Sequence, residues 1–233
     1  MLFSKTNDES VNEYLAKCEF SRYTDPMEEQ FIISQAEFVT SAGLGGQYPE
    51  PLPCEIAIVG KSNVGKSSLI NRLANNQKLA KTSAQPGKTR LVNFFLLNKA
   101  LYLVDLPGYG FAKASKTEQK SWGELLERYL SSGRVKHLLM LIDIRHAPTQ
   151  DDLQMFRYLI YYNIPYTLVA TKADKIAKSK RKQEANKRAK ELGAPPFALP
   201  FSSETGEGKA ELLQRIGQIC EDCIPKEKES PEE

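Results

Sequence analysis

Histidine and cysteine, the residues that most often hold transition metals, are scarce in this sequence. It has two histidines and four cysteines among 233 residues. His137 and His146 flank an expected strand and are not spaced as metal ligands, and Cys220-x-x-Cys223 has no second ligand pair to complete a zinc site. The two cysteines also continue the apolar face of an expected helix. We therefore expect them to pack in the core rather than to bind metal or undergo redox chemistry.

Long apolar runs and a large excess of charge of one sign are also lacking. No run approaches the ~20 residues that a membrane span needs. The formal net charge is +3, which is too small by itself to indicate nucleic-acid binding. Neither a signal peptide nor a disulfide framework can be recognised, so we expect a cytosolic protein with no membrane span. The hydrophobic fraction of 41% and the charged fraction of 26% are those of an ordinary globular protein.

The most informative stretch runs from Cys54 to Asn71 and reads CEIAIVGKSNVGKSSLIN. Glu55–Val59 is a short apolar run that predicts a buried strand, and apolar residues one helical turn apart predict a helix after it. Between them lies Gly-x-x-x-x-Gly-Lys-Ser, whose glycines let the backbone approach a phosphate closely. The loop N–H groups and the helix N-terminus would face the anion. This pattern predicts a phosphate-binding P-loop, with Lys66 at the β- and γ-phosphates and Ser67 as a Mg²⁺ ligand.

Expected strands and helices alternate along the rest of the chain. The strands are expected at 91–97, 100–105, 136–144, 166–171 and 197–201, and the helices at 67–75, 117–131, 149–162 and 209–223, with a basic helix ending near 192. Residues 31–40 fit either a strand or a short helix. This alternation predicts an α/β fold of three layers, with a mostly parallel sheet, one antiparallel strand and helices on both faces. We expect a flexible N-terminal extension over 1–23, one P-loop domain over 24–224 and a disordered tail over 225–233.

Two further motifs follow later strands, at the edge of the sheet where ligands bind in such folds. Asp105-x-x-Gly108 places an acid where a Mg²⁺-associated carboxylate belongs, and the Gly108 N–H would meet the γ-phosphate. Thr171-Lys172-Ala173-Asp174 favours guanine over adenine, because one carboxylate can accept from both N1–H and the exocyclic amine of guanine. The Lys172 stem can lie along the face of the base. Ser202 and Ser203, after the last strand, could add backbone contacts to guanine O6.

These motifs occur in the order typical of translation-factor-type GTPases. The phrases GKSNVGKSSLIN, PGKT followed by NFF, and DLPGYGFAKAS closely resemble the EngB (YihA/YsxC) family of the TrmE-Era-EngA-EngB-septin-like group. The resemblance covers about residues 31–223. It implies a P-loop GTPase of Ras-like fold that binds ribosomal subunits in large-subunit assembly and is linked to cell division and septation.

Site residues are carried over from this resemblance by position. A first switch is expected at about 81–90, where Thr89 would be a second Mg²⁺ ligand, although a plain loop threonine is the alternative. Lys66, Thr89 and Asn63 are the expected catalytic residues. The full set of expected GTP contacts is Gly60, Lys61, Ser62, Asn63, Val64, Gly65, Lys66, Ser67, Gly87, Lys88, Thr89, Arg90, Leu91, Asp105, Leu106, Pro107, Gly108, Thr171, Lys172, Ala173, Asp174, Phe201, Ser202 and Ser203.

Hydrolysis is expected to be slow. Tyr109 stands where many signalling GTPases place the glutamine that orients the attacking water, and a phenol cannot do that in the same way. The side-chain carbonyl of Asn63 could help to hold a potassium ion between the α- and γ-phosphates, as related GTPases with Asn at this position can. The alternative is that Asn63 only stabilises the loop through its own hydrogen bonds.

Basic residues are concentrated between Lys172 and Lys190. They are Lys175, Lys178, Lys180, Arg181, Lys182, Lys187, Arg188 and Lys190. Either a solvated helix face or an RNA-facing patch fits this composition.

Three functions therefore remain open from the sequence. The best supported is a GTP- and GDP-binding switch that uses Mg²⁺ and has a ribosomal partner, both rRNA and ribosomal proteins. The others are a nucleotide kinase or ATPase with the same loop, and an interaction module that binds nucleotide without significant turnover. A kinase would lack the Thr-Lys-x-Asp motif.

Overall fold

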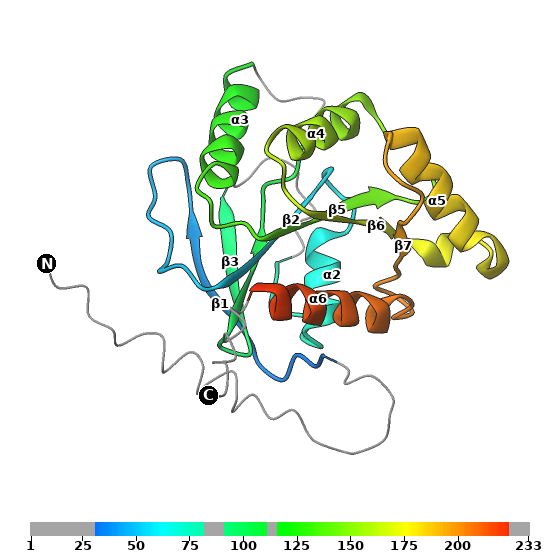
Figure 1. Cartoon of the computed structure of the whole chain (residues 1–233), viewed down its shortest axis with the longest axis horizontal. Coiled ribbons are helices and arrows are strands. Elements are labelled where there is room, and N and C mark those ends of the chain that lie inside the picture. The colour runs from blue at the N-terminus through cyan, green and yellow to red at the C-terminus, as the bar shows by residue number, and fades with distance from the viewer. Residues whose placement is uncertain (1–30, 82–90, 111–115, 224–233) are drawn as a thin grey trace, which may run out of the picture.

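The fold of this chain is a single twisted sheet with helices on both sides, seen in a computed structural model that describes residues 31–81, 91–110 and 116–223 (Figure 1). The strands are β1 (Ala36–Ala42), β2 (Cys54–Gly60), β3 (Val92–Leu97), β4 (Leu101–Asp105), β5 (His137–Asp143), β6 (Tyr166–Thr171) and β7 (Leu199–Pro200). The helices are α2 (Lys66–Leu73), α3 (Lys116–Leu130), α4 (Gln150–Tyr161), α5 (Arg181–Leu192) and α6 (Lys209–Cys223), with short 3₁₀ turns η1 (Ala173–Lys175) and η2 (Lys178–Lys180).

The strand order is β1-β3-β4-β2-β5-β6-β7. β3 is antiparallel to both of its neighbours, β1 and β4, whereas the other neighbouring strands are parallel to each other. One strand of this sheet thus runs against the rest, and the predicted architecture is confirmed.

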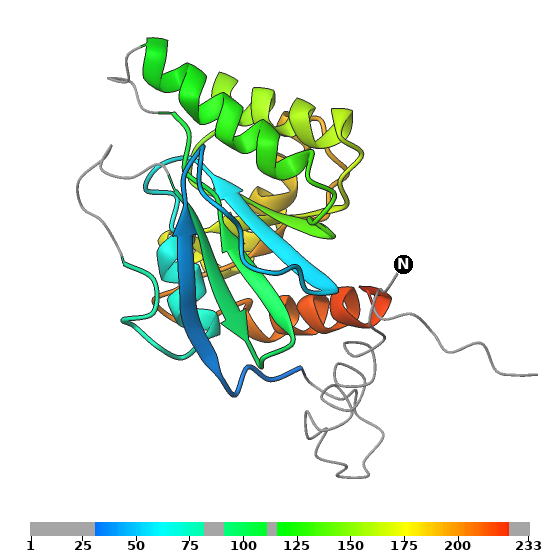
Figure 2. The ribbon, with the colours of Figure 1, turned by 90° about the vertical axis from the view of Figure 1, so that its left-hand side faces the viewer.

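The sheet separates two hydrophobic cores, because successive side chains of a strand point to opposite faces. Ala57 and Val59 of β2 pack with α3, α4 and α5, and Ile56 and Ile58 pack with α2 and α6. Figure 2 shows α3 and α4 on one side of the sheet and α2 and α6 on the other. All seven residues of β2 are buried; apart from Glu55, which pairs with Arg134, they are apolar or small.

The structure resolves one open prediction and corrects two others. The ambiguous region 31–40 contains strand β1, which pairs with β3 and begins at Ala36. The basic segment after Asp174 is not one helix but two 3₁₀ turns followed by α5. The last strand is shortened to Leu199–Pro200, and the Phe197 N–H donates to the Pro195 carbonyl oxygen of its own segment instead of to a neighbouring strand.

In the part of the chain that the structure describes, every helix is too short or too polar to cross a bilayer. The expected packing of the Cys-x-x-Cys pair is seen directly: Cys220 and Cys223 pack against the core, and the Cys54 and Cys220 Sγ atoms lie 3.5 Å apart.

Candidate nucleotide-binding site

The P-loop begins where β2 ends, and its backbone takes up conformations that the sequence requires. Gly65 has φ +112°, a left-handed conformation that glycine adopts easily, and Asn63 has φ +63°. At Gly60 a Cβ atom would lie 2.8 Å from Val64 Cγ1 and 2.9 Å from the Leu141 carbonyl oxygen. Glycine at that position is therefore needed for the loop to pass over β5. α2 starts directly at Lys66, so its N-terminal N–H groups face the space that the loop encloses.

The loop after β4 packs directly against the P-loop. The Ser62 N–H donates to the Tyr109 carbonyl oxygen at 2.9 Å, and Lys61 and Tyr109 form an isolated parallel bridge. A Cβ atom at Gly108 would lie 3.0 Å from Lys66 Nζ and 3.3 Å from the Gly60 carbonyl oxygen. Gly108 therefore lies close to Lys66, the lysine that is expected to bind phosphate.

Asp105 and Ser67 fit the role of Mg²⁺ ligands. Asp105 ends β4 beside Ile58 of β2, and its Oδ1 atom is buried with no hydrogen-bond partner. Burial raises the pKa of this carboxyl, an effect that the nearby Lys66 ammonium opposes. An orphaned carboxylate oxygen at the end of β4 and the Ser67 hydroxyl in the first turn of α2 are both oxygen ligands of the kind that Mg²⁺ prefers. The ion would compensate the cost of burying this acid.

The guanine motif is tied to the P-loop by hydrogen bonds. Lys172 Nζ donates to the Asn63 carbonyl oxygen at 2.8 Å and to Asp143 Oδ2 at 2.9 Å. The Thr171 hydroxyl donates to the Val64 carbonyl oxygen at 2.7 Å. The two motifs, more than a hundred residues apart in sequence, thus form one rigid unit.

Asp143 is a site residue that the motifs did not predict. It ends β5 and also accepts from Arg145, whose Nε and Nη2 lie 2.9 and 2.8 Å from its two oxygens. Burial opposes its ionisation, but the hydrogen bonds from Arg145 and Lys172 outweigh that effect and hold the pKa of Asp143 well below its usual value. Asp143 therefore positions the Lys172 stem. An acid at the end of an apolar strand, as at Asp105, was the available signal.

Asp174 and Ser202, two residues expected at the guanine base, are hydrogen-bonded to each other. The Ser202 hydroxyl donates to Asp174 Oδ1 at 2.7 Å, and Lys175 Nζ lies 3.0 Å from Oδ2. Burial opposes ionisation of Asp174, and these hydrogen bonds outweigh it and lower its pKa. The Ala173 N–H donates to the Phe201 carbonyl oxygen at 3.0 Å, which fixes the end of β7 beside the carboxylate. Ser202 and Lys175 thus hold the Asp174 carboxylate in place as an ionised acceptor.

The Tyr109 side chain contacts α4 and is not placed to orient a water molecule. Its ring is buried, and its hydroxyl donates to Asp152 Oδ1 on α4 at 2.7 Å. Burial raises the pKa of this phenol, so Tyr109 stays a proton donor.

Four residues expected in the first switch lie outside the described residues: Gly87, Lys88, Thr89 and Arg90. Leu91 is described and directly precedes β3.

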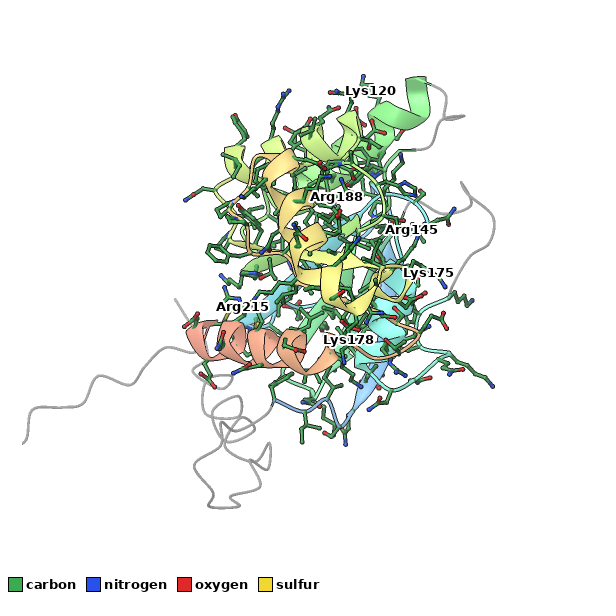
Figure 3. The ribbon with its side chains drawn as sticks, turned by 90° about the vertical axis from the view of Figure 1, so that its right-hand side faces the viewer. Lys120, Arg145, Lys175, Lys178, Arg188 and Arg215 are labelled. Carbon is green, nitrogen blue, oxygen red and sulfur yellow. The ribbon has the colours of Figure 1, made fainter. Side chains whose placement is uncertain are left out.

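Only part of the basic segment is available to a partner. Arg181 pairs with Glu207, and Arg188 pairs with Glu184 at 3.1 Å and Glu191 at 2.8 Å. The exposed lysines with no ion pair to another described residue are Lys178, Lys180, Lys182, Lys187 and Lys190. Figure 3 shows Lys175, Lys178 and Arg188 on one face of the molecule with Arg145.

Comparison with known proteins agrees with this geometry. Residues 55–172 match the family model described as "50S ribosome-binding GTPase". The chain is 50% identical over 193 residues to the probable GTP-binding protein EngB of Clostridium kluyveri, covering 81% of this chain and 98% of that protein. The chain belongs to the EngB family of GTP-binding proteins. The EngB protein of Bacillus subtilis is 47% identical over 190 residues, covering 80% of this chain and 97% of its own.

Solved structures support the EngB fold. A crystal structure of a probable GTP-binding protein EngB has a TM-score of 0.60 at 23% identity, covering 72% of this chain and all of that one. Era in complex with MgGDPNP and nucleotides 1506–1542 of 16S ribosomal RNA has a TM-score of 0.57 at 26% identity. That match covers 76% of this chain and 59% of Era. These matches show that the fold of the chain is that of P-loop GTPases.

Proposed function

We propose that this protein is a GTP-dependent switch that associates with the large ribosomal subunit during its assembly. The observation that carries the guanine part of this proposal is the Lys172–Asn63 hydrogen bond, because it joins the phosphate loop to the base-recognition motif. A kinase or ATPase with the same P-loop has no need of that second motif. The ribosomal part is supported by the family model's description and by the exposed lysines of the α5 region.

Binding would proceed through the groups already described. The loop N–H groups and Lys66 hold the phosphates, and Asp174 accepts hydrogen bonds from guanine. Ser67 and Asp105, with Thr89 of the first switch, would hold Mg²⁺, which supplies positive charge at the β- and γ-phosphates. The Gly108 N–H would donate to the γ-phosphate when GTP is bound and would lack this partner when GDP is bound. The loop would therefore differ between the two nucleotide states.

We expect hydrolysis to be slow without a partner. The Tyr109 phenol is committed to Asp152, so it is not available to orient water. Catalysis would then depend on positioning and on electrostatic stabilisation.

Asn63 is our candidate ligand for potassium, because it is exposed and has a positive φ in the P-loop. Potassium should accelerate hydrolysis relative to sodium at equal ionic strength, and Asn63→Ala should remove the difference; equal rates in both salts for the parent protein would refute this role.

The test of the proposed function is co-sedimentation with ribosomal subunits in three states: without nucleotide, with GDP and with a non-hydrolysable GTP analogue. We expect binding to the large subunit to be tightest with the GTP analogue. Binding that is independent of nucleotide would favour the alternative of an interaction module whose nucleotide only stabilises the fold.

A ribosomal partner would place the protein in the cytoplasm. The link to cell division and septation rests on the family resemblance, and depletion followed by measurement of subunit profiles before any division defect would test it.

A further inference from the structure

The loop that would sense the γ-phosphate is fastened to two helices. Trp122 of α3 donates its indole N–H to the Pro107 carbonyl oxygen at 3.0 Å. The Tyr109 hydroxyl donates to Asp152 of α4 at 2.7 Å, and the Tyr109 and Trp122 rings pack edge to face with centroids 6.1 Å apart. On its other side, the Tyr109 carbonyl accepts from the P-loop at Ser62. Tyr109 therefore bridges the P-loop and α4.

Asp152 has a second task on α4. Its Oδ2 atom accepts from both the backbone N–H and the hydroxyl of Thr149, each at 2.7 Å, and completes a capping box at the helix start. One buried carboxylate thus receives three hydrogen bonds, two from the helix cap and one from Tyr109. A movement of Tyr109 that breaks its bond leaves Asp152 Oδ1 buried without a partner, which is costly.

We propose that the Tyr109–Asp152 hydrogen bond couples the phosphate-sensing loop to the start of α4, and that Asp152 is a positioning residue for discrimination between GTP and GDP. The inference rests on the proposed switch function. The bond holds Gly108 close to Lys66, where its N–H can meet a γ-phosphate. The triphosphate state is therefore the state that the bond favours. By the reciprocity of coupling, the triphosphate also steadies the first turn of α4, which displays Gln150 and Asp151 at the surface.

The chain offers a well-matched set of variants. Tyr109→Phe removes only the hydroxyl and keeps the ring on Trp122, and Asp152→Ala removes the acceptor. Thr149→Ala is the control, because it weakens the helix cap and leaves the Tyr109–Asp152 bond in place. The first measurement is the ratio of affinities for a fluorescent non-hydrolysable GTP analogue and for fluorescent GDP.

Tyr109→Phe and Asp152→Ala should each lower this ratio by about three- to tenfold, the change to which one buried hydrogen bond corresponds. The double variant should lower it no further than the single ones, because both remove the same interaction. Thr149→Ala should keep the parent ratio. If Thr149→Ala lowers the ratio as much as the other two, helix stability explains the effect and the proposal is wrong.

The second measurement is amide hydrogen exchange at residues 149–153 with each nucleotide. In the parent and in Thr149→Ala, protection should differ between the GTP analogue and GDP. In Tyr109→Phe the difference should vanish. A parent protein that binds neither nucleotide would refute the proposed function, whereas a parent with normal binding and unchanged discrimination in Tyr109→Phe would refute only this inference.

Discussion

Lys172 Nζ lies 2.8 Å from the carbonyl oxygen of Asn63, so the base-recognition motif and the phosphate loop hold each other in place. Asp143 supports the same ammonium from the end of β5 at 2.9 Å. The two contacts leave little freedom to the Lys172 side chain, whose stem is expected to lie along the guanine ring. Affinity for the base and affinity for the phosphates should accordingly be linked.

Asp143→Ala should weaken GTP and GDP binding alike, by about 1 kcal/mol, because it removes one of the two hydrogen bonds that place Lys172. Selectivity for guanine should persist, since Asp174 is untouched. Arg145→Ala is the matched control, because it removes the other partner of Asp143 and keeps the contact with Lys172. Titration with fluorescent nucleotides measures both, and equal affinities for all three proteins would contradict the positioning role.

Asp174→Asn should weaken GTP binding by roughly 1–3 kcal/mol, the cost of leaving a buried donor of guanine unsatisfied. The new amide can donate to the exocyclic oxygen of xanthine, so preference should shift toward xanthine nucleotides. Competition of GTP, XTP and ATP against a fluorescent GDP gives the order of affinities. Unchanged guanine selectivity would show that Asp174 does not read the base.

Ser67→Ala should remove most of the dependence of nucleotide affinity on Mg²⁺, because it deletes a proposed ligand of the ion. Thr89→Ala should reduce affinity only for the triphosphate, since the first switch is expected to engage the ion when a γ-phosphate is present. Affinity measured in Mg²⁺ and in EDTA separates these effects. A Mg²⁺ dependence equal to that of the parent would exclude Ser67 as a ligand.

Replacing Lys180, Lys182 and Lys187 with Ala should weaken binding to ribosomal subunits and lower the slope of log affinity against log salt by up to about 0.9 for each lost phosphate contact. GTP affinity should stay the same. Replacing Lys78, Lys120 and Lys136, exposed elsewhere on the surface, removes the same charge and should have a smaller effect. Equal effects of the two triple variants would assign the interaction to net charge rather than to this face.

His137 should make the fold sensitive to acid. It is buried against the Thr167 hydroxyl at 2.8 Å, and burial together with the nearby charge of Arg215 lowers its pKa to about 4. Between pH 6.5 and about 4 the unfolded chain therefore binds a proton that the folded chain does not, and the free energy of unfolding falls as the pH falls. The loss should be on the order of 3 kcal/mol. Urea unfolding across this range, compared with His137→Gln, should show a shallower pH dependence in the variant.

The sequence predicts the parts of this molecule that depend on neighbours along the chain. The P-loop, Asp105–Gly108 and Thr171–Asp174 are recognisable because each combines a buried strand with a loop of fixed spacing. Asp143 and Asp152 were missed, because their roles come from side chains that lie 29 and 43 positions away in the sequence. Contacts of this kind follow from the sheet order and not from local pattern.

For the basic segment, composition alone was a poor guide to how much of its charge is free. A count of its charges overstates its free positive charge, because Arg181 and Arg188 are ion-paired within the fold. The Glu184–Arg188 pair has i,i+4 spacing and was readable from the sequence. The Arg181–Glu207 pair was not, since it joins α5 to the loop before α6.

The antiparallel pairing of β1 with β3 has a consequence for how partners can recognise this protein. β3 follows the expected first switch, and its two edges are already hydrogen-bonded, to β4 and to β1. A partner cannot lengthen the sheet by adding a strand beside β3, a common mode of recognition at open edges. The strand at that border of the sheet is β1, which contributes nothing to the nucleotide site. We therefore expect partners that distinguish the two nucleotide states to contact loops and helix ends rather than the edge of β3.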